Sequence, residues 1–397
     1  MGDDYALLTE STVAAYLAAH PELASRIDPR TVCAREIGDG NLNLVFVCCD
    51  DHGRSLVLKQ SIPWVRAAGP SWPLTADRSH AEARGLTESS RVAPTTSVEL
   101  ISYDAAEHVL ALEDLSHLRP WRARLLDGAI TPGVTDACGR HLARLAFGTG
   151  MLGRPAHDVR AAMGHAANPE LCRITEDLVF TEPYGDHPNN RDDSSLAEAV
   201  TALRSDRRVR DAVSRLKLEF TTRADALVHG DLHTGSIMVG DGDRPETKVI
   251  DAEFCFHGPI AFDLGSLLGH LLIATARAAA LGAEAQRRWL EEQPAELWAA
   301  FCAEFWTQWP YRADLALTDA SAQQHLDRFA SDAVGFAACE AIRRVIGLAQ
   351  VADLETLPHL LRAPAARAIL ATAHRWLVCP GPITAPLLPD LLETIPT

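Results

Sequence analysis

The most constraining feature of this chain is a pair of apolar runs that end in carboxylates. Residues 227–239 read Leu-Val-His-Gly-Asp-Leu-His-Thr-Gly-Ser-Ile-Met-Val, which places Asp231 at the tip of a tight turn between two apolar segments. Further on, residues 248–253 read Lys-Val-Ile-Asp-Ala-Glu, so another apolar strand ends in Asp251 and Glu253. Short apolar runs bounded by glycine and polar residues are typical of hairpins. The pattern predicts a β-hairpin that carries three carboxylates.

This set of acids suits phosphoryl transfer. The reaction needs one carboxylate to orient the attacking hydroxyl and others to hold the magnesium ion that bridges the phosphates of ATP. We assign the first role to Asp231 and the second to Asp251 and Glu253. Solvated acids at hairpin ends are the ordinary alternative, but they do not explain why His229 and Gly230 precede Asp231 as in a kinase catalytic loop. We therefore predict a kinase that uses ATP and Mg²⁺.

Composition excludes several other classes. The formal net charge of −16 argues against a general nucleic-acid binder, because phosphate backbones select basic surfaces. The nine cysteines include no Cys-x-x-Cys pair, so we expect reduced thiols in a cytoplasmic protein. The longest apolar stretch, residues 259–281, is interrupted by Asp263, His270 and Arg277. It predicts a buried helix and no membrane span.

The order of the expected elements indicates an α+β, two-lobed fold. Helical spacing occurs at residues 12–24 and 76–88, and strands are predicted at 42–49, 55–60, 98–103 and 108–112. Beyond Ser116 the chain is mostly helical apart from the hairpin. A small antiparallel β-sheet lobe with one main helix, followed by a large helical lobe, is the order of a protein-kinase-like fold. We predict an N-lobe over residues 1–112, a hinge over 113–116 and a C-lobe over 117–397.

Small residues before the first long strand are candidates for contact with ATP phosphates. Glycines let backbone N–H groups approach phosphates closely, and asparagine adds a side-chain donor, which points to Gly38, Gly40, Asn41 and Asn43. An ordinary hairpin turn explains this short segment equally well. Lys59 ends the next strand and resembles the lysine that grips the α- and β-phosphates in kinases, although a solvated edge charge is the usual role of such a residue.

The following helix and the lobe junction complete the predicted ATP site. The helix offers Glu82 as the ion-pair partner of Lys59, with Glu88 as the competitor. At the lobe junction, backbone groups can contact the edge of adenine at Glu113, Asp114 and Leu115. Each of these signals is weak alone, but together with the catalytic turn they occur in the order that a kinase requires.

Together these residues resemble the S-methyl-5-thioribose kinase family, which is similar to the aminoglycoside phosphotransferase and choline kinase branch of the kinase fold. The resemblance rests on residues 38–43, 69–75, 113–118, 229–236, 251–253, 258–263 and 339–349. Protein kinases place an asparagine five residues after the catalytic acid as a magnesium ligand. Here that position is Ser236, as this family's pattern prefers, and Asp251-x-Glu253 replaces Asp-Phe-Gly.

The resemblance implies a substrate and a set of contacts. It implies that the anomeric hydroxyl of 5-methylthioribose is phosphorylated to the 1-phosphate in methionine salvage, and that the protein is a homodimer. The anomeric hydroxyl of this sugar would contact Asp231, and we place His233 on the substrate side of the loop. A flat apolar side chain suits the methylthio group, which points to Trp72, although packing between the lobes explains this tryptophan equally well. We expect His229 to shape the loop and give neither histidine a chemical role. The chain departs from the family pattern at Ala252, where proline is usual, and at Pro70 and His257, which we expect near the sugar pocket.

Two adjacent arginines complete the predicted site. Arg343 and Arg344 lie in a helix predicted at residues 334–351, and adjacent helical residues diverge by about 100°. We therefore expect them to point in different directions, with one pairing to Glu340. The resemblance implies that the other contacts the sugar or the transferring phosphoryl group, a role that suits the charged, planar guanidinium. The sequence leaves open which arginine does so.

Three alternatives differ in substrate or in chemistry. The first is a kinase of a related 5-modified pentose such as 5-deoxyribose. The second is an aminoglycoside or choline kinase, which an acidic chain permits but Ser236 disfavours. The third is a non-catalytic kinase-like protein. Degenerate kinases usually lose the lysine, the catalytic acid or the metal-binding acid, whereas Lys59, Asp231, Asp251 and Glu253 are all present here.

Overall fold

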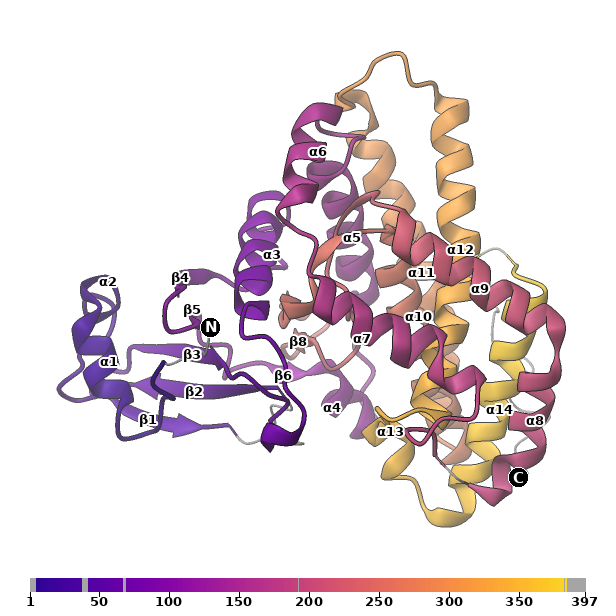
Figure 1. Cartoon of the computed structure of the whole chain (residues 1–397), viewed down its shortest axis with the longest axis horizontal. Helices are drawn as coiled ribbons and strands as arrows, with labels where there is room; N and C mark the ends of the chain where they lie inside the picture. The colour runs from indigo at the N-terminus through magenta and orange to yellow at the C-terminus, as the bar shows by residue number, and fades with distance from the viewer. Residues whose placement is uncertain (1–4, 38–41, 67–68, 192, 382, 384–397) are drawn as a thin grey trace.

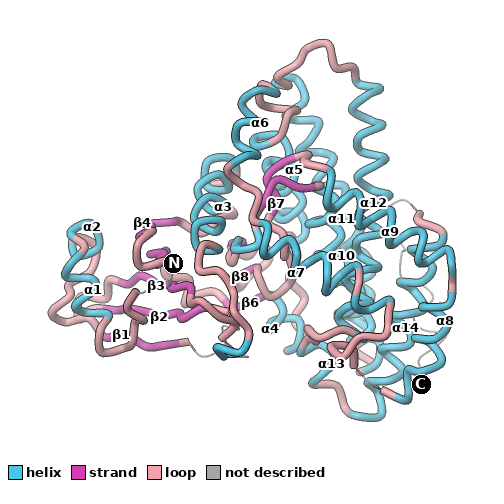
Figure 2. Tube along the Cα trace, in the orientation of Figure 1, coloured by secondary structure: helices cyan, strands magenta, loops and turns pink. Residues whose placement is uncertain are grey.

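A computed structural model describes residues 5–37, 42–66, 69–191, 193–381 and 383. Figure 1 shows two lobes, with the strands of the small lobe on the left and a large group of helices on the right. Figure 2 shows the same division, because the longer strands lie in the small lobe and helices make up most of the large one. The predicted α+β, protein-kinase-like fold is confirmed.

The small lobe is built on a five-stranded antiparallel sheet. Its strand order is β1-β2-β3-β5-β4, formed by β1 (Cys33–Glu36), β2 (Asn43–Cys49), β3 (Ser55–Ser61), β5 (Val109–Leu112) and β4 (Leu100–Asp104). Successive strand residues face opposite sides of a sheet. Phe46 and Leu58 therefore pack under α1 (Val13–Ala19) and α2 (Pro21–Ala24), whereas Leu110 packs against α3 (Arg78–Val92) on the other face. Lys59 follows Leu58 and so lies on the α3 face.

The N-terminal helix differs from its prediction. Residues 12–24 form two short helices, because His20 between them is extended at φ −113° and ψ 97°. Pro21 begins the second helix, and proline disfavours helical backbone in the residue before it.

The large lobe consists mainly of helices around one apolar core. Its helices are α4 (Trp121–Leu126), α5 (Val134–Thr149), α6 (Ala156–Gly164), α7 (Pro169–Phe180), α8 (Ala197–Ser205), α9 (Arg207–Thr222), α10 (Ile260–Ala280), α11 (Glu284–Gln308), α12 (Asp319–Ile346), α13 (Ala352–Glu355) and α14 (His359–Val378). The centre of this core is the contact between α10 and α12. A Cβ atom on Gly265 would lie 2.5 Å from the Cβ of Phe336, so only glycine permits this close approach.

Helix α10 corresponds to the long apolar stretch in the sequence. Among the described residues it is the one helix long and apolar enough to cross a membrane, but 94% of its apolar window is buried inside the protein. The prediction of a buried helix at this position is confirmed.

The predicted hairpin around Asp231 is wrong in its pairing. Strand β7 (Ala226–Val228), before the turn, pairs with β10 (Phe256–Gly258), whereas β8 (Ile237–Val239), after it, pairs with β6 (Arg119–Pro120) and β9 (Thr247–Val249). Residues 229–236 therefore connect two separate sheets. The true hairpin is β8–β9, and it brings Asp251 back to the catalytic turn because Ile250 N–H donates to the Ser236 carbonyl at 3.0 Å.

His141 on α5 makes the stability of this fold depend on pH. It is 2% exposed, and its Nδ1 lies 2.8 Å from Thr96 Oγ1. Burial, together with the nearby His229 and Arg144, lowers the pKa of His141 to about 3. The folded state thus binds fewer protons than the unfolded state. The contribution of His141 to the free energy of unfolding is therefore complete above the unfolded pKa near 6.5 and is lost as the pH falls below it.

We predict that His141→Gln reduces the pH dependence of the free energy of unfolding. Below pH 6.5 the wild-type free energy should fall about 1.4 kcal/mol per pH unit more steeply than that of the variant. Urea unfolding at several pH values between 5 and 7.5 measures this slope. His157→Gln, at an exposed position, should leave it unchanged. Equal slopes for the wild type and the His141 variant would contradict the prediction.

Candidate active site

A buried ion cluster joins the two lobes at Lys59. Its Nζ lies 2.7 Å from Glu82 Oε1 on α3 and 2.5 Å from Asp251 Oδ1, which follows β9. Burial opposes the charge of Lys59, but the carboxylates of Asp251, Glu82 and Glu253 outweigh it and raise the lysine pKa. The expected contact with Glu82 is present, whereas Glu88 pairs with Arg91 instead.

Asp251 occupies a strained turn at the end of β9. Its φ of 65° lies in the left-handed region, which is uncommon for a residue other than glycine. Burial raises the pKa of its carboxyl, but Lys59 more than offsets that effect, so the pKa is lowered. The side chain is still half-exposed, and Oδ2 has no hydrogen-bond partner among the described residues. One oxygen of Asp251 is therefore held and the other is accessible.

Helix α10 fixes the start of the turn over residues 229–236, which we call the catalytic turn. Asp263, fully buried on α10, accepts the backbone N–H groups of His229 at 2.6 Å and Gly230 at 2.9 Å. His229 Nε2 lies 2.7 Å from the carbonyl of Ile250, so His229 shapes the loop as expected. Gly230 has φ 83°, and a Cβ there would lie 2.2 Å from the Phe254 carbonyl oxygen, so no other residue fits.

The end of the catalytic turn is fixed by its own side chains. His233 Nδ1 accepts the N–H groups of Gly235 and Ser236, both at 3.0 Å. This leaves Nε2 as the protonated nitrogen, and it lies 3.5 Å from Asp231 Oδ2. Burial and the nearby Arg122 hold the pKa of His233 well below its usual value. Ser236, at the position where other kinases have asparagine, accepts His233 N–H at 2.9 Å and thus braces the loop.

Both arginines converge on Asp231, which corrects the expectation that they point apart. Arg343 and Arg344 place their terminal nitrogens 3.1 Å and 3.5 Å from the same oxygen, Asp231 Oδ1. Both also pair with Glu340, at 2.5 Å and 2.7 Å. Their helix, α12, begins well before the predicted residue 334 and ends at Ile346. Long side chains can bend around the helix, which the angle between adjacent residues does not take into account.

A buried arginine that was not predicted from the sequence lies behind Glu253. Arg78, fully buried at the start of α3, donates hydrogen bonds to five oxygens, those of Glu253, Asn43 and the carbonyls of Leu42, Ile62 and Thr75. Asn43 Nδ2 also donates to Glu253 Oε2 at 3.0 Å. Glu253 is therefore tied to the start of β2. A charged residue opening a helix is normally exposed, so the sequence gives no sign of this role.

The remaining residues predicted for the ATP site belong to the segment before β2 and to the lobe junction. Gly38, Gly40 and Asn41 are outside the described residues. At the lobe junction, the Glu113 side chain accepts from Lys248 Nζ at 2.9 Å and Asp114 Oδ1 accepts the Ser116 N–H at 2.9 Å. Within the described part of the chain, the Glu113 carbonyl and the Leu115 N–H have no hydrogen-bond partner, so they can pair with the edge of adenine.

Trp72 and His257 are the two further residues that we expected near the sugar. Trp72 is partly buried in a loop. A backbone hydrogen bond closes this loop, because the Trp72 carbonyl accepts the Val65 N–H at 2.9 Å. His257 lies on β10 and lines a cavity of about 280 Å³ with Cys172 and Phe220, so its nearness to the sugar stays a prediction. None of Asp231, Arg343 and Arg344 lines that cavity.

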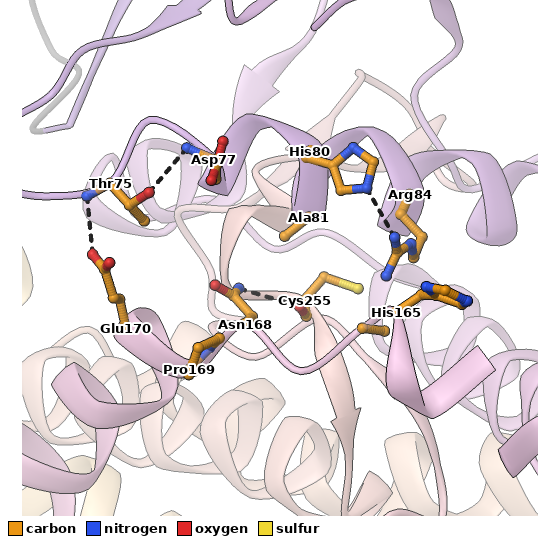
Figure 3. A pocket seen from close by; sticks show the side chains of 11 residues that line it. Thr75, Asp77, His80, Ala81, Arg84, His165, Asn168, Pro169, Glu170 and Cys255 are labelled. Atoms are coloured by element: carbon orange, nitrogen blue, oxygen red, sulfur yellow. Dashed lines mark hydrogen bonds between the residues drawn. The ribbon is translucent and has the colours of Figure 1, made fainter. Parts of the chain in front are cut away.

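A cavity of about 220 Å³ separates α3 from the segment that joins α6 to α7 (Figure 3). On one side Glu170 accepts the Thr75 N–H at 3.1 Å, and on the other Arg84 contacts His80 at 2.9 Å. Asn168 donates to the carbonyls of Glu253 and Cys255, at 2.9 and 3.2 Å. The acids and arginines around Asp231 do not line this cavity. Its contacts join α3 to the large lobe.

This fold and set of side chains define the class of protein. A family model described as "Phosphotransferase enzyme family" matches residues 34–302, which include Lys59, Asp231 and Asp251. The chain belongs to this family of phosphotransferases, as the fold predicted from the sequence implies.

Similar proteins assign the chain to a smaller group within this family. Methylthioribose kinase of Yersinia pseudotuberculosis serotype O:1b is 43% identical over 342 residues, which cover 83% of this chain and 82% of that protein. Methylthioribose kinase of Pectobacterium carotovorum subsp. carotovorum is 41% identical over 366 residues, covering 89% and 90%. Within the phosphotransferases, the chain therefore belongs to the methylthioribose kinase family, and the resemblance seen in its motifs is confirmed.

Solved structures with a similar outline are more distant. An ethanolamine kinase of Plasmodium vivax has a TM-score of 0.47 and 10% sequence identity, and the match covers 94% of this chain and 90% of that one. A likeness of this degree carries no information on the substrate.

We predict that Arg78→Lys strongly destabilises the protein. Lysine cannot reach five acceptors, so Glu253 and buried carbonyls lose their partner, which should lower the free energy of unfolding by about 3–5 kcal/mol. Urea unfolding at pH 7.5 measures the change. Arg84→Lys on the same helix removes a contact to His80 alone and should cost less than about 1 kcal/mol. Similar losses for the two variants would contradict the role given to Arg78.

Proposed function

We propose that the chain is an ATP-dependent kinase that phosphorylates the anomeric hydroxyl of 5-methylthioribose to give the 1-phosphate. The observation that carries the proposal is the arrangement at Asp231. Arg343 and Arg344 both contact Oδ1, at 3.1 and 3.5 Å, which leaves Oδ2 to accept a substrate hydroxyl. Methylthioribose kinases at 41–43% identity support this choice of sugar. The place in methionine salvage follows from the family resemblance.

Each group around Asp231 has a part in this mechanism. Asp231 orients the hydroxyl and receives its proton late, because a loose phosphoryl transition state depends on positioning more than on deprotonation. The Nε2–H of His233, 3.5 Å from Asp231 Oδ2, donates to the bound sugar. The two guanidinium groups face the negative charge of the transferring phosphoryl group, which permanent cations stabilise well. Trp72 covers the apolar methylthio end of the sugar.

The ATP site lies on the small-lobe side of Asp231. The family implies that ATP is the phosphoryl donor. We assign its α- and β-phosphates to Lys59, held by Glu82, and to the segment of Gly38, Gly40, Asn41 and Asn43. Adenine contacts the backbone at Glu113, Asp114 and Leu115. With these assignments, the phosphate contacts lie in an N-lobe over residues 1–112 and the adenine contacts lie in a hinge over 113–116. Residues 117–397 form the C-lobe.

Asp251 and Glu253 suit Mg²⁺, which would neutralise charge on the phosphates of ATP. Asp251 Oδ2 and Glu253 Oε1 have no hydrogen-bond partner among the described residues. Hard carboxylate oxygens are the donors that Mg²⁺ prefers. Magnesium usually takes one or two carboxylates and completes its shell with water and phosphate oxygens, so these two residues suffice. Lys59 holds the other oxygen of Asp251, and Arg78 holds the other oxygen of Glu253.

Two further expectations stay predictions. The homodimer rests on the family resemblance, and the cytoplasmic location rests on the composition. Among the alternative functions, a kinase of another 5-modified pentose keeps the same mechanism and differs in the contact that Trp72 makes with the sugar.

We predict that 5-methylthioribose is the preferred acceptor in a coupled ADP-release assay with Mg-ATP. The panel also contains 5-deoxyribose, ribose, choline and kanamycin, and phosphorus NMR identifies the product. An acid-labile anomeric phosphate made from methylthioribose is the expected result. A higher kcat/KM for 5-deoxyribose would move the proposal to another pentose, and preferred turnover of choline or kanamycin would overturn it.

We predict that Asp231→Asn lowers kcat by about 10³-fold or more, because the variant can neither orient the hydroxyl as an anion nor accept its proton. The affinity for Mg-ATP, measured by calorimetry, should stay within about twofold, since Asp231 contacts the acceptor side. Asp241→Asn, an exposed acid in the loop after β8, is the matched control and should retain wild-type activity. Undiminished turnover by the Asp231 variant would exclude the proposed role.

A further inference from the structure

A single carboxylate on α12 holds both arginines of the catalytic site. Glu340 Oε2 lies 2.5 Å from Arg343 Nε, and its Oε1 lies 2.7 Å from Arg344 Nε. Glu340 is 1% exposed, and burial opposes its ionisation. The two guanidinium groups outweigh that penalty and hold the pKa of Glu340 well below its usual value.

Helix geometry explains why both arginines turn toward the same acid. A residue three positions later lies about 60° to one side of Glu340, and a residue four positions later lies about 40° to the other side. Arg343 and Arg344 occupy these two positions and so flank Glu340. Each guanidinium can take one carboxylate oxygen through Nε, and its terminal nitrogens then extend beyond the carboxylate.

The far ends of the two arginines meet at Asp231. Their terminal nitrogens lie 3.1 and 3.5 Å from Asp231 Oδ1, so the position of Glu340 determines where both positive charges stand relative to this acid. Glu340 itself has no hydrogen bond to Asp231 within the described residues. The two arginines are therefore its direct link to Asp231.

Glu340 is held in turn by α10. His270 Nε2 lies 3.1 Å from Glu340 Oε1, and Arg122 contacts the other ring nitrogen at 3.3 Å. A Cβ on Gly269 would lie 2.8 Å from the Ala337 carbonyl oxygen and 3.1 Å from the Glu340 Cβ, so this glycine brings α10 close enough for the contact. The carboxylate cannot shift without disturbing the packed core.

We propose that Glu340 is a positioning residue that fixes Arg343 and Arg344 as one preassembled unit against Asp231. This inference rests on the proposed kinase function. It implies that loss of Glu340 displaces both guanidinium groups at once, although neither arginine is altered. A purely structural role for Glu340 would instead lower stability and leave kcat intact.

The chain offers a matched control on the same helix. Asp332 is also buried, at 3% exposed, and also holds two arginines, Arg215 at 2.7 Å and Arg223 at 2.9 Å. Neither of these arginines pairs with Asp231. Asp332→Asn therefore removes a comparable buried anion from α12 without reaching the catalytic site.

The test compares Glu340→Gln, Glu340→Asp and Asp332→Asn. Both Glu340 variants should lower kcat, by about 100-fold for Gln, because a displacement near 1 Å at the reacting groups costs this much. The KM for ATP should change less than about twofold. Glu340→Asp keeps the charge and tests the proposal if the Gln variant does not fold. Asp332→Asn should lose stability but retain kcat.

A second measurement is independent of turnover. The Nε–H signals of Arg343 and Arg344 in nitrogen-15 NMR should both shift and exchange faster in Glu340→Gln, and neither should change in Asp332→Asn. If the wild type phosphorylates no sugar, the proposed function fails, while these signals still decide whether Glu340 holds both arginines. Unchanged kcat in both Glu340 variants, or a shift of one signal alone, would overturn the inference.

Discussion

The ion pair between Lys59 and its two carboxylates is the contact on which the rest of the site depends. It joins β3, α3 and the turn after β9, which belong to different lobes. Moving an ammonium group out of water is costly unless it is paired, so this 3% exposed lysine is stable only with Glu82 and Asp251 in place. The sheet, the main helix of the small lobe and Asp251 are therefore positioned relative to one another by one charge.

The groups that surround the reaction are held from behind by a second set of residues. Asp263 fixes the backbone before Asp231, Ser236 braces the backbone after it, and Arg78 fixes Glu253. Glu340 does the same for the paired arginines. Because these supports are buried, the reacting groups need little reorganisation, which is the usual basis of electrostatic catalysis.

Local patterns in the sequence predicted the small lobe better than the large one. Apolar periodicity and motif order predicted strands β2 to β5, the buried helix at residues 260–280 and the pairing of Lys59 with Glu82. They did not predict β1 or most of the individual helices of the large lobe. The pairing of β7 with β10 could not be predicted, because short apolar strands have no preferred partner until the sheets assemble. The convergence of Arg343 and Arg344 was also missed, since helical angles describe the backbone and not long side chains.

By itself the sequence determined the class of chemistry, because carboxylates, a strand lysine and glycine turns at fixed spacings leave few alternatives to phosphoryl transfer. It also determined the membership of the methylthioribose kinase family, through motifs spread along most of the chain. Only the tertiary structure decided which charges pair across long stretches of sequence. Arg78 finds Glu253 and Glu340 finds His270 across sequence separations of 175 and 70 residues. Such contacts depend on how helices and strands pack, and packing is a property of the whole chain.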